Sequence, residues 1–398
     1  MPKLFAMLRH LSFSAPKQNL VAILHKEDYW LRALVLKEVP ATTVQVFPEV
    51  SAVYFRPYLA WRFVLALRRV SWAKVFRGDR NGALRELYCC YLIALLDRIG
   101  ARVVLTHIDN SGIFQKLSRL DTRRNYFAIQ NGLRTLACVR DSLPPHPHPM
   151  ANISMSNFFC FGQRDVELFR AHGHQIDNYF PVGSVLGSYY KSRKTAMPVI
   201  TRFDLCLISQ WHARFFDDLL GDGYIWQTAR RIRRAMDPMH QFLTQLLDET
   251  DLSLAVCLRS EDVEEYRFYE ALFKERAVLI RADREKFSTY RTVEESKLAI
   301  GLNSTVLAEA FSWGNKVLWC NVPADEHFQM PEAGPTYFEG SDYNAFKRQV
   351  LEMLAMSPEE FSVATRSCAR FINAFDAERP AHIAIRQAVL ASLSPSNE

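Results

Sequence analysis

Residues 298–319 constrain the fold of this chain more than any other segment. They begin with an apolar run whose length suits a buried strand, continue through a polar turn at residues 303–305, and then show helical spacing up to residue 313. Gly314 follows where a helix end favours a residue free to adopt positive φ, and residues 316–320 are a second apolar run. The segment therefore predicts a compact strand–helix–strand unit with a polar turn at the start of its helix.

The start of this predicted helix is a natural site for an anion. In a parallel sheet, the carboxyl end of a strand meets a helix N-terminus, whose free N–H groups and dipole attract phosphate. Asn303, Ser304 and Thr305 form that turn, and Glu309 lies one helical turn further, where a carboxylate would accept hydrogen bonds from a ribose. Ser304 and Thr305 are also ordinary helix caps, and Glu309 by itself fits a solvated helix position equally well.

The second half of the chain alternates strands with helices. Apolar runs predict strands at residues 203–208, 252–258 and 277–280, ahead of the unit at 298–320. Helical spacing predicts helices at 224–247, with a break or kink near Pro238, and at 263–273, 292–296, 342–355, 359–376 and 381–393, with a loop at 332–337. Such alternation is typical of a parallel, doubly wound sheet.

The first half shows the same alternation over a similar length. Strands are expected at 19–24, 43–47, 102–106, 125–129, 158–161 and 178–182, with helices at 30–36, 81–99, 113–120 and 165–172. Residues 185–198 are weakly patterned and rich in Ser, Gly and Lys, so we interpret them as an interdomain linker. We therefore predict an α/β protein with Rossmann-like domains at 1–187 and 199–375, and a last helix within 376–398 that can pack back on the first domain.

Composition supports a folded protein with two domains. The chain has 398 residues, of which 49% are hydrophobic and 23% charged, as expected for a globular protein large enough to bury two cores. The net charge of +6 permits a basic patch for phosphate or anionic lipid but gives no support for a nucleic-acid partner.

The sequence favours a cytoplasmic protein. None of the eight cysteines has metal-ligand spacing, and several lie in apolar runs, as reduced and buried thiols do. We find no signal peptide, and the densest apolar run, residues 88–96, is too short to cross a bilayer. Residues 58–80 mix aromatic and basic side chains. This pattern fits peripheral contact with the inner membrane surface or, more commonly, a core-packed helix with a solvated basic face.

Polar turns follow three predicted strands of the first domain, at the sheet edge where open α/β proteins bind ligands. The side chains in these turns are Asp28 after the first strand, Asp109 and Asn110 after residues 102–106, and Gln130, Asn131 and Arg134 after residues 125–129. The Asn131-Gly132 dipeptide is also common turn chemistry, and Asp109 fits equally well as the cap of a helix that begins near Gly112.

Several common enzyme signatures are missing from the sequence. No strand is followed by Gly-x-Gly-x-x-Gly or a Walker lysine motif, which removes the main support for a dinucleotide-dependent dehydrogenase or a P-loop ATPase. No Gly-x-Ser-x-Gly elbow is present, which weakens the case for a hydrolase of that type.

The order of the polar turns resembles that of GT-B glycosyltransferases. The shared features are Ile108-Asp109-Asn110, Gln130-Asn131-Gly132-Leu133-Arg134, Gly183-Ser184, Ser209-Gln210-Trp211, and Asn303-Ser304-Thr305 with Glu309, Ala310 and Gly314. More narrowly, the chain is similar to the enzymes of bacterial surface-polysaccharide clusters, which build lipopolysaccharide O-chain or capsule, and is nearest to their Kdo-transferase-like group. The Gln-Asn-Gly-Leu-Arg turn is the more particular signal, because the Ser-Thr…Glu-Ala…Gly element is common to many GT-B enzymes.

This resemblance implies a donor site in the second domain. By analogy with the family, Asn303, Ser304 and Thr305 at the helix N-terminus hold the donor phosphate, and Glu309 holds the ribose. Further residues implied at the donor side of the cleft are Ser209, Gln210, His212 and Arg259. Arg259 supplies positive charge in this interpretation, but it fits equally well as an ion-pair partner of Glu261 or Asp262.

The resemblance also implies an acceptor site in the first domain. Glycosyl transfer needs a base for the acceptor hydroxyl, and we expect Asp109 in that role, with Asp28 second. The side chains implied to orient sugar hydroxyls are Asn110, Gln130, Asn131 and Arg134. Enzymes of this type generally work without a bound metal, and no Asp-x-Asp motif is present, so we expect no metal and no cofactor.

We therefore expect a glycosyltransferase that moves a sugar from a nucleotide-sugar donor to a growing surface glycan. A CMP-Kdo-like acidic sugar would suit Arg134, Arg259 or His212, and a UDP- or GDP-hexose is equally open. The first alternative is a UDP-sugar epimerase of the same fold, which would act on its substrate without an acceptor. The second is a non-catalytic scaffold of a polysaccharide assembly complex, which would bind no nucleotide.

Overall fold

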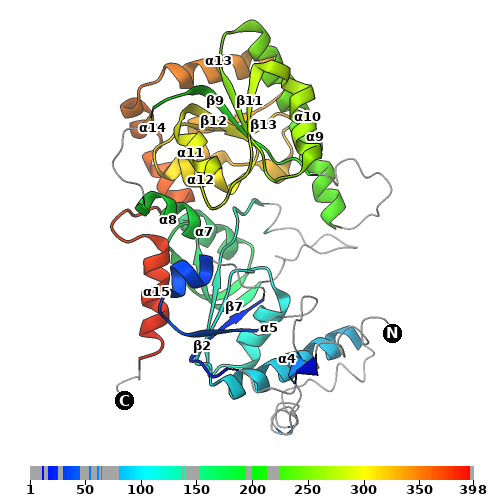
Figure 1. Ribbon diagram of the computed structural model, residues 1–398, viewed down its shortest axis with the longest axis vertical. Coiled ribbons are helices and arrows are strands. Elements are labelled where there is room, and N and C mark those ends of the chain that lie inside the picture. The colour runs from blue at the N-terminus through cyan, green and yellow to red at the C-terminus, as the bar shows by residue number, and fades with distance from the viewer. Residues whose placement is uncertain are drawn as a thin grey trace.

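The chain folds into two α/β lobes, as Figure 1 shows. The computed structural model describes residues 11–12, 17–25, 30–44, 53–54, 61, 64, 80–136, 139, 153–193, 200–212 and 224–394. Each lobe is built on a six-stranded sheet in which all strand pairs are parallel. The predicted architecture, two parallel sheets each flanked by helices, is therefore confirmed.

The first lobe, here called the N-lobe, contains the sheet ordered β3-β2-β5-β6-β7-β8. Its strands are β2 (Val21–Leu24), β3 (Ala41–Val44), β5 (Val103–Thr106), β6 (Asn125–Ile129), β7 (Ser154–Cys160) and β8 (Gln175–Pro181). Its helices are the π-helix η1 (Leu31–Leu36) and the α-helices α4 (Arg80–Ile99), α5 (Gly112–Leu120), α7 (Gln163–Ala171) and α8 (Val185–Arg193). The short strands β1 (Leu11–Ser12) and β4 (Val53–Tyr54) pair with each other outside this sheet.

Strand periodicity explains how the N-lobe sheet buries both of its faces. Successive residues of a strand point to opposite faces, so Ala22 and Leu24 of β2 pack into one core with α4 and α5. Val21 and Ile23 pack into the other core, with η1. A sheet that is covered on both faces needs strands without polar alternation, which is the pattern seen in β2 and β5.

The second lobe, here called the C-lobe, contains the sheet ordered β11-β10-β9-β12-β13-β14. Its strands are β9 (Phe203–Ile208), β10 (Leu254–Cys257), β11 (Ala277–Ile280), β12 (Ser296–Gly301), β13 (Val317–Asn321) and β14 (Tyr337–Glu339). Its α-helices are α9 (Tyr224–Glu249), α10 (Val263–Phe273), α11 (Ser288–Glu294), α12 (Thr305–Ser312), α13 (Tyr343–Ala355) and α14 (Pro358–Ile372). Strand order reverses between β9 and β12, which is where open α/β sheets bind ligands.

The last helix of the chain lies on the first lobe. Helix α15 (Ala381–Ala391) contributes Ile385 and Val389 to the core that also contains Val21 and Ile23, and Figure 1 shows it beside the N-lobe. The Arg386 side chain donates a hydrogen bond from Nε to the Val35 carbonyl oxygen at 2.9 Å. The chain therefore crosses between the lobes twice.

A close seam joins the two lobes where the chain makes its second crossing. A Cβ atom at Gly162 would lie 2.2 Å from the Phe371 carbonyl oxygen, so only glycine allows this approach. Gly183 has φ of +88° and meets the Ala374 carbonyl oxygen in the same way. The Ala374 amide donates to the Phe161 carbonyl oxygen at 2.7 Å. These contacts hold the carboxyl ends of β7 and β8 against the end of α14.

Some local predictions were wrong. Residues 185–193 form helix α8 where a weakly patterned linker was expected, because Val185, Gly187 and Ser188 are buried against neighbouring elements. Helix α9 runs through Pro238, so of the break or kink expected there the break is not found. The predicted loop at 332–337 is largely the 3₁₀ helix η6 (Pro331–Thr336), followed by strand β14.

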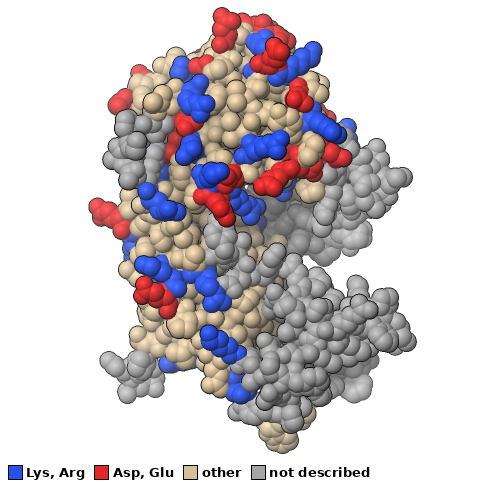
Figure 2. Space-filling model, viewed as in Figure 1, with Lys and Arg blue, Asp and Glu red and all other residues tan. Residues whose placement is uncertain are grey.

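Figure 2 shows where charge lies on one face of the molecule. Acidic and basic side chains are intermixed over the C-lobe, whereas the described N-lobe surface in this view carries mainly basic ones. Asp28 and most of segment 58–80 lie outside the described residues, so the structure does not address their predicted roles. No helix within the described ranges is long and apolar enough to span a membrane.

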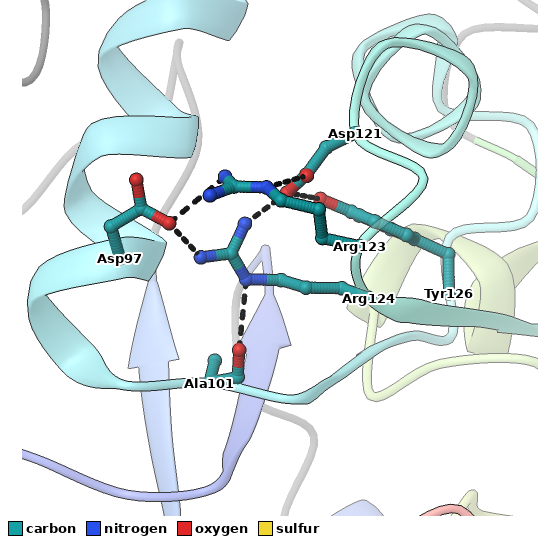
Figure 3. Close-up of polar contacts among 6 residues, drawn as sticks. All are labelled: Asp97, Ala101, Asp121, Arg123, Arg124 and Tyr126. Carbon is teal, nitrogen blue, oxygen red and sulfur yellow. Dashed lines mark hydrogen bonds and ion pairs between the residues drawn. The ribbon is translucent and has the colours of Figure 1, made fainter.

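An ionic network closes the amino-end corner of the N-lobe, far from the carboxyl ends of the strands (Figure 3). Buried Asp121 accepts hydrogen bonds from Arg123 at 3.0 Å, from Tyr126 at 3.2 Å, and from Arg124. Arg123 and Arg124 also pair with Asp97 at the end of α4. Burial acts to raise the pKa of Asp121, but the charges of Arg124 and Arg123 outweigh it and hold the pKa below its usual value.

Candidate functional site

A cleft of about 410 Å³ lies between the carboxyl ends of the two sheets. The N-lobe wall consists of Trp30, His107, Gln130, Asn131, Phe161, Ser184, Val185 and Leu186. The C-lobe wall consists of Ile208, Ser209, Cys257, Leu258, Arg259, Ala282, Asp283, Arg284, Phe287, Ser288, Thr289, Tyr290, Ser304, Thr305, Val306 and Glu309. The site is therefore built by turns that follow strands of both sheets, as expected for ligand sites of open parallel sheets.

The start of helix α12 forms part of the C-lobe wall. Ser304 is the N-cap residue of α12. The Ser304 hydroxyl makes no capping hydrogen bond to the helix. The Thr305 hydroxyl accepts a hydrogen bond from the Leu133 amide of the N-lobe at 3.0 Å. The predicted anion site at this helix start therefore lies in the cleft, in contact with the turn that follows β6.

Two arginines face the cleft from neighbouring C-lobe turns. Arg259 follows β10 and Arg284 follows β11, and both side chains are exposed. Within the described residues neither makes an ion pair, so the alternative pairing of Arg259 with Glu261 or Asp262 is not found. Arg284 was not identified from the sequence, although it follows a predicted strand in the same way as Arg259.

An amide pair spans the point where the C-lobe strand order reverses. Gln210 Nε2 donates to Asn303 Oδ1 at 2.7 Å, and the Asn303 amide donates back to Gln210 Oε1 at 3.3 Å. Neither residue belongs to the cleft wall, and His212 does not either. Gln210 and Asn303 therefore brace the turns that carry Ser209 and Ser304.

Glu309 belongs to the C-lobe wall but is almost fully buried, with 1% of its surface exposed. The Ser184 hydroxyl of the N-lobe donates a hydrogen bond to Glu309 Oε1, so the contact joins the lobes. Burial raises the pKa of Glu309 to about 7, although hydrogen bonds from Ser184 and Tyr290 favour the ionised form. Neither Ser184 nor Tyr290 was identified as a site residue from the sequence.

The N-lobe wall combines amides with aromatic rings. Gln130 Oε1 accepts from the Phe161 amide at 3.1 Å, and its Nε2 donates to the Gly132 carbonyl oxygen at 3.0 Å. Asn131 is exposed in the same turn. Trp30 packs edge-on against His107 with ring centroids 5.5 Å apart. Such a wall offers apolar faces and a few fixed polar groups, which suits the faces and hydroxyls of a sugar.

Asp109 is held in an ion pair outside the cleft wall. Its carboxylate is 0% exposed and accepts from Arg134 Nη2 at 2.5 and 2.6 Å. The same nitrogen donates to Asn131 Oδ1 at 2.8 Å. Helix α5 is capped by Ser111, which accepts from the Phe114 amide, so Asp109 is not its cap. Asp109 and Arg134 therefore position Asn131, and Asn110, like them, is not part of the wall.

His107 is the titratable side chain that the described N-lobe wall presents to the cleft. It follows β5 directly, two positions before Asp109, and was not among the site residues expected from the sequence. Nearby His25 is hydrogen-bonded through Nδ1 to the Thr106 hydroxyl at 2.9 Å. Burial lowers the pKa of His25 to about 4, and the charge of His107 acts in the same direction, so His25 is neutral at physiological pH.

No group of three or more His, Cys, Asp or Glu side chains is placed to hold a metal ion in the parts of the chain that the structure describes. The arrangement can hold an anion on the C-lobe wall and a polyhydroxylated group on the N-lobe wall. His107, which lies on the N-lobe wall, is 7% exposed.

Comparison with known proteins gives one family model and several structures of similar fold. A family model described as "putative O-antigen biosynthesis protein" matches residues 127–383. The UDP-GlcNAc 2-epimerase from Neisseria meningitidis bound to UDP-GlcNAc is 12% identical, with a TM-score of 0.51 over 94% of this chain and 98% of that one. The S. aureus MnaA–UDP co-structure is 12% identical, with a TM-score of 0.52 over 94% and 95%. No curated protein matches the sequence.

A further structure, of a UDP-N-acetylglucosamine 2-epimerase, is 14% identical, with a TM-score of 0.53 over 96% of this chain and 98% of that one. At such identities the likeness establishes the fold alone. The GT-B-like architecture expected from the sequence is thereby confirmed.

Proposed function

The chain belongs to the O-antigen biosynthesis family whose model matches residues 127–383, and we propose that it transfers a sugar from a nucleotide-sugar donor to a growing surface glycan. The observation that carries this proposal is the contrast between the two walls of the cleft. The C-lobe wall has two arginines without ion-pair partners among the described residues, beside a helix N-terminus. The N-lobe wall has amides, aromatic rings and one titratable side chain.

The donor is bound on the C-lobe wall as a nucleoside diphosphate sugar. Arg259 and Arg284 reach the cleft from adjacent turns, and the N-terminus of α12 adds its free N–H groups. Two phosphates match this arrangement better than one. An acidic sugar is less well served, because Arg134 is already bound to Asp109 and Asn131. We therefore favour a UDP- or GDP-linked neutral sugar over a CMP-linked acidic one.

His107 is the base of the proposed reaction. Its imidazole takes the proton from the acceptor hydroxyl while that oxygen bonds to the anomeric carbon and the diphosphate oxygen leaves. The arginines stabilise the charge that develops on the leaving diphosphate. Asp109, expected from the sequence to be the base, acts through Arg134 to position Asn131. Ser184 and Tyr290 hold Glu309, which stays a candidate for the ribose hydroxyls.

Epimerisation of a UDP-sugar is the second candidate function. It is supported by the fold shared with the epimerases, one of them bound to UDP-GlcNAc. Inversion at carbon 2 requires that a proton be removed from that carbon and another returned to it, which calls for more than one acid–base group. The described N-lobe wall supplies one such group, His107, whereas Asp283 and Glu309 lie on the C-lobe wall with the proposed phosphate site, so we favour transfer.

A nucleotide panel followed by an activity assay tests the proposal. UDP, GDP and CMP are compared for thermal stabilisation of the full chain; a ligand at about 100 times its dissociation constant adds about 2.7 kcal/mol. A nucleoside diphosphate should stabilise more than CMP. Consumption of a sugar donor that depends on a glycan acceptor supports transfer. Isomerisation without acceptor establishes the epimerase, and no stabilisation by any nucleotide supports the scaffold.

A further inference from the structure

We infer that Glu265 is a positioning residue of the donor site, which holds the two C-lobe turns that carry Ser209 and Arg259 to the cleft. The inference rests on the proposed function, because it gives Glu265 a part in binding the donor diphosphate. Glu265 lies in the first turn of α10, and its side chain is 0% exposed. It cannot touch the ligand, so its influence must pass through the residues that it holds.

Four hydrogen bonds converge on the Glu265 carboxylate. Oε1 accepts from the Ser209 hydroxyl at 2.5 Å and from the Arg259 amide at 2.8 Å. Oε2 accepts from the Ser260 amide at 3.0 Å and from the Ser260 hydroxyl at 2.9 Å. One side chain therefore fixes the turn after β9 and the turn after β10 relative to each other.

Helix capping does not explain this arrangement. A glutamate at the third position of a helix commonly reaches back to the amide of the N-cap residue. Here the amide of the N-cap residue Asp262 donates instead to the Ser260 hydroxyl, and Asp262 itself accepts from the Glu264 amide. Glu265 does not cap the helix, and its carboxylate bonds to the two turns that line the cleft.

The choice of a carboxylate has a consequence for the cleft. Hydrogen bonds to a charged acceptor are about twice as strong as those between neutral groups, so Ser209 and Arg259 are held firmly. Because the Arg259 amide is occupied, that residue faces the ligand with its guanidinium alone. Ser209 Oγ, in turn, accepts from the Trp211 amide at 3.1 Å, so its hydroxyl proton is committed to Glu265. Glu265 therefore fixes the backbone of the turn from which the exposed Arg259 side chain extends.

The test measures binding of inorganic pyrophosphate and of UDP to the full chain by calorimetry, at a temperature where each variant is folded. Arg259→Ala should weaken binding roughly tenfold. Glu265→Gln, which replaces an acceptor by a donor facing the amides, should weaken it by about threefold or more. The double variant should bind about as weakly as Arg259→Ala, because Glu265 acts through that residue.

Asp121→Asn is the matched control, since it neutralises an equally buried carboxylate that holds no part of the cleft. It should lower stability and leave pyrophosphate affinity unchanged. Normal affinity in Glu265→Gln, with Arg259→Ala impaired, overturns the inference and leaves the proposed function standing. Independent, additive losses in the double variant, or an equal loss in Asp121→Asn, also overturn it. Absence of binding by the unmodified chain overturns the proposed function itself.

Ser260→Ala keeps the test decisive if Glu265→Gln does not fold. It removes one of the four donors and leaves the buried charge in place. A smaller but measurable loss of pyrophosphate affinity, which disappears in the Arg259→Ala background, supports the positioning role. Unchanged affinity in Ser260→Ala then overturns it.

Discussion

Two regions of the molecule, one corner of the N-lobe and the interlobe cleft, use charge in opposite ways. At the amino-end corner of the N-lobe, Asp97 and Asp121 pair with Arg123 and Arg124, so the ionic groups satisfy one another (Figure 3). At the interlobe cleft, the two wall arginines Arg259 and Arg284 make no ion pair within the described residues, and the buried carboxylate of Glu265 is held by neutral donors. Paired charges stabilise a fold, whereas unpaired cations on a cleft wall are ready for an anionic ligand.

The largest expected effect is that of His107→Ala, which should change activity and leave stability almost unchanged. Loss of the proposed base should lower turnover by about 10²- to 10⁴-fold, while the free energy of unfolding changes little. Turnover is measured at saturating donor and acceptor. His172→Ala, on the N-lobe but outside the cleft wall, should be normal. Near-normal turnover in His107→Ala would assign the base to another residue.

Asp121→Ala should have the converse effect. Removing this buried carboxylate leaves Asp97 to compensate both Arg123 and Arg124, and we expect a loss of about 3 kcal/mol in the free energy of unfolding. Denaturant unfolding measures the loss, and nucleotide affinity of the folded protein should be retained. The pKa of Asp121 is lower in the folded state than in the unfolded state. Its contribution to the free energy of unfolding is therefore present above the unfolded-state pKa and disappears as the pH falls through the folded-state pKa. A variant as stable as the unmodified protein would contradict the assignment.

Glu309→Gln tests a buried carboxyl group that has no arginine beside it in the contacts described. The folded-state pKa of Glu309, about 7, exceeds the ordinary value of 4.5. The contribution of this carboxyl group to the free energy of unfolding is therefore full below pH 4.5 and is lost as the pH rises through 7. The glutamine variant should lack this pH dependence, which amounts to about 3 kcal/mol, and should be the more stable protein at pH 8. Glu38→Gln, whose side chain is 90% exposed, is the control. Parallel stability–pH curves for unmodified protein and Glu309→Gln would refute the expectation.

Arg284→Ala should have the smallest effect of the four. The exposed guanidinium contributes one charge-assisted contact to the diphosphate, so nucleotide affinity should fall roughly tenfold, and more at low salt than at high salt. Arg276→Ala is the control, since that side chain pairs with Asp248 at the surface of the same lobe. Equal affinities for Arg284→Ala and unmodified protein would confine the anion site to Arg259 and α12.

Much of the fold followed from local patterns. Strands β6 and β11 and helix α10 have the predicted bounds, and the unit at 298–319 was found with small shifts. The errors have a common cause. Helix α8 lacks a clear apolar stripe because both lobes contact it, and three-residue β14 is too short to show a period.

The candidate site was predicted in outline but not in detail. Ser209, Arg259, Ser304, Thr305, Gln130 and Asn131 do line the cleft, because turns after parallel strands meet at one sheet edge. Which side chain of a turn faces the ligand was not predictable. His107 lines the cleft and Asp109, two residues on, does not, because Arg134 holds its carboxylate in an ion pair.

The amino-acid sequence by itself determined the class of fold, the two runs of alternating strands and helices, and the turns that meet at the carboxyl edges of the sheets. These follow from periodicity and turn chemistry, which act over a few residues. Only the tertiary structure decided which polar groups bond to one another. Asp109 accepts from Arg134, Glu309 accepts from Ser184, and Glu265 accepts from Ser209 and Arg259. Such pairings join residues far apart in the chain, and their strength depends on distances and burial that no local pattern encodes.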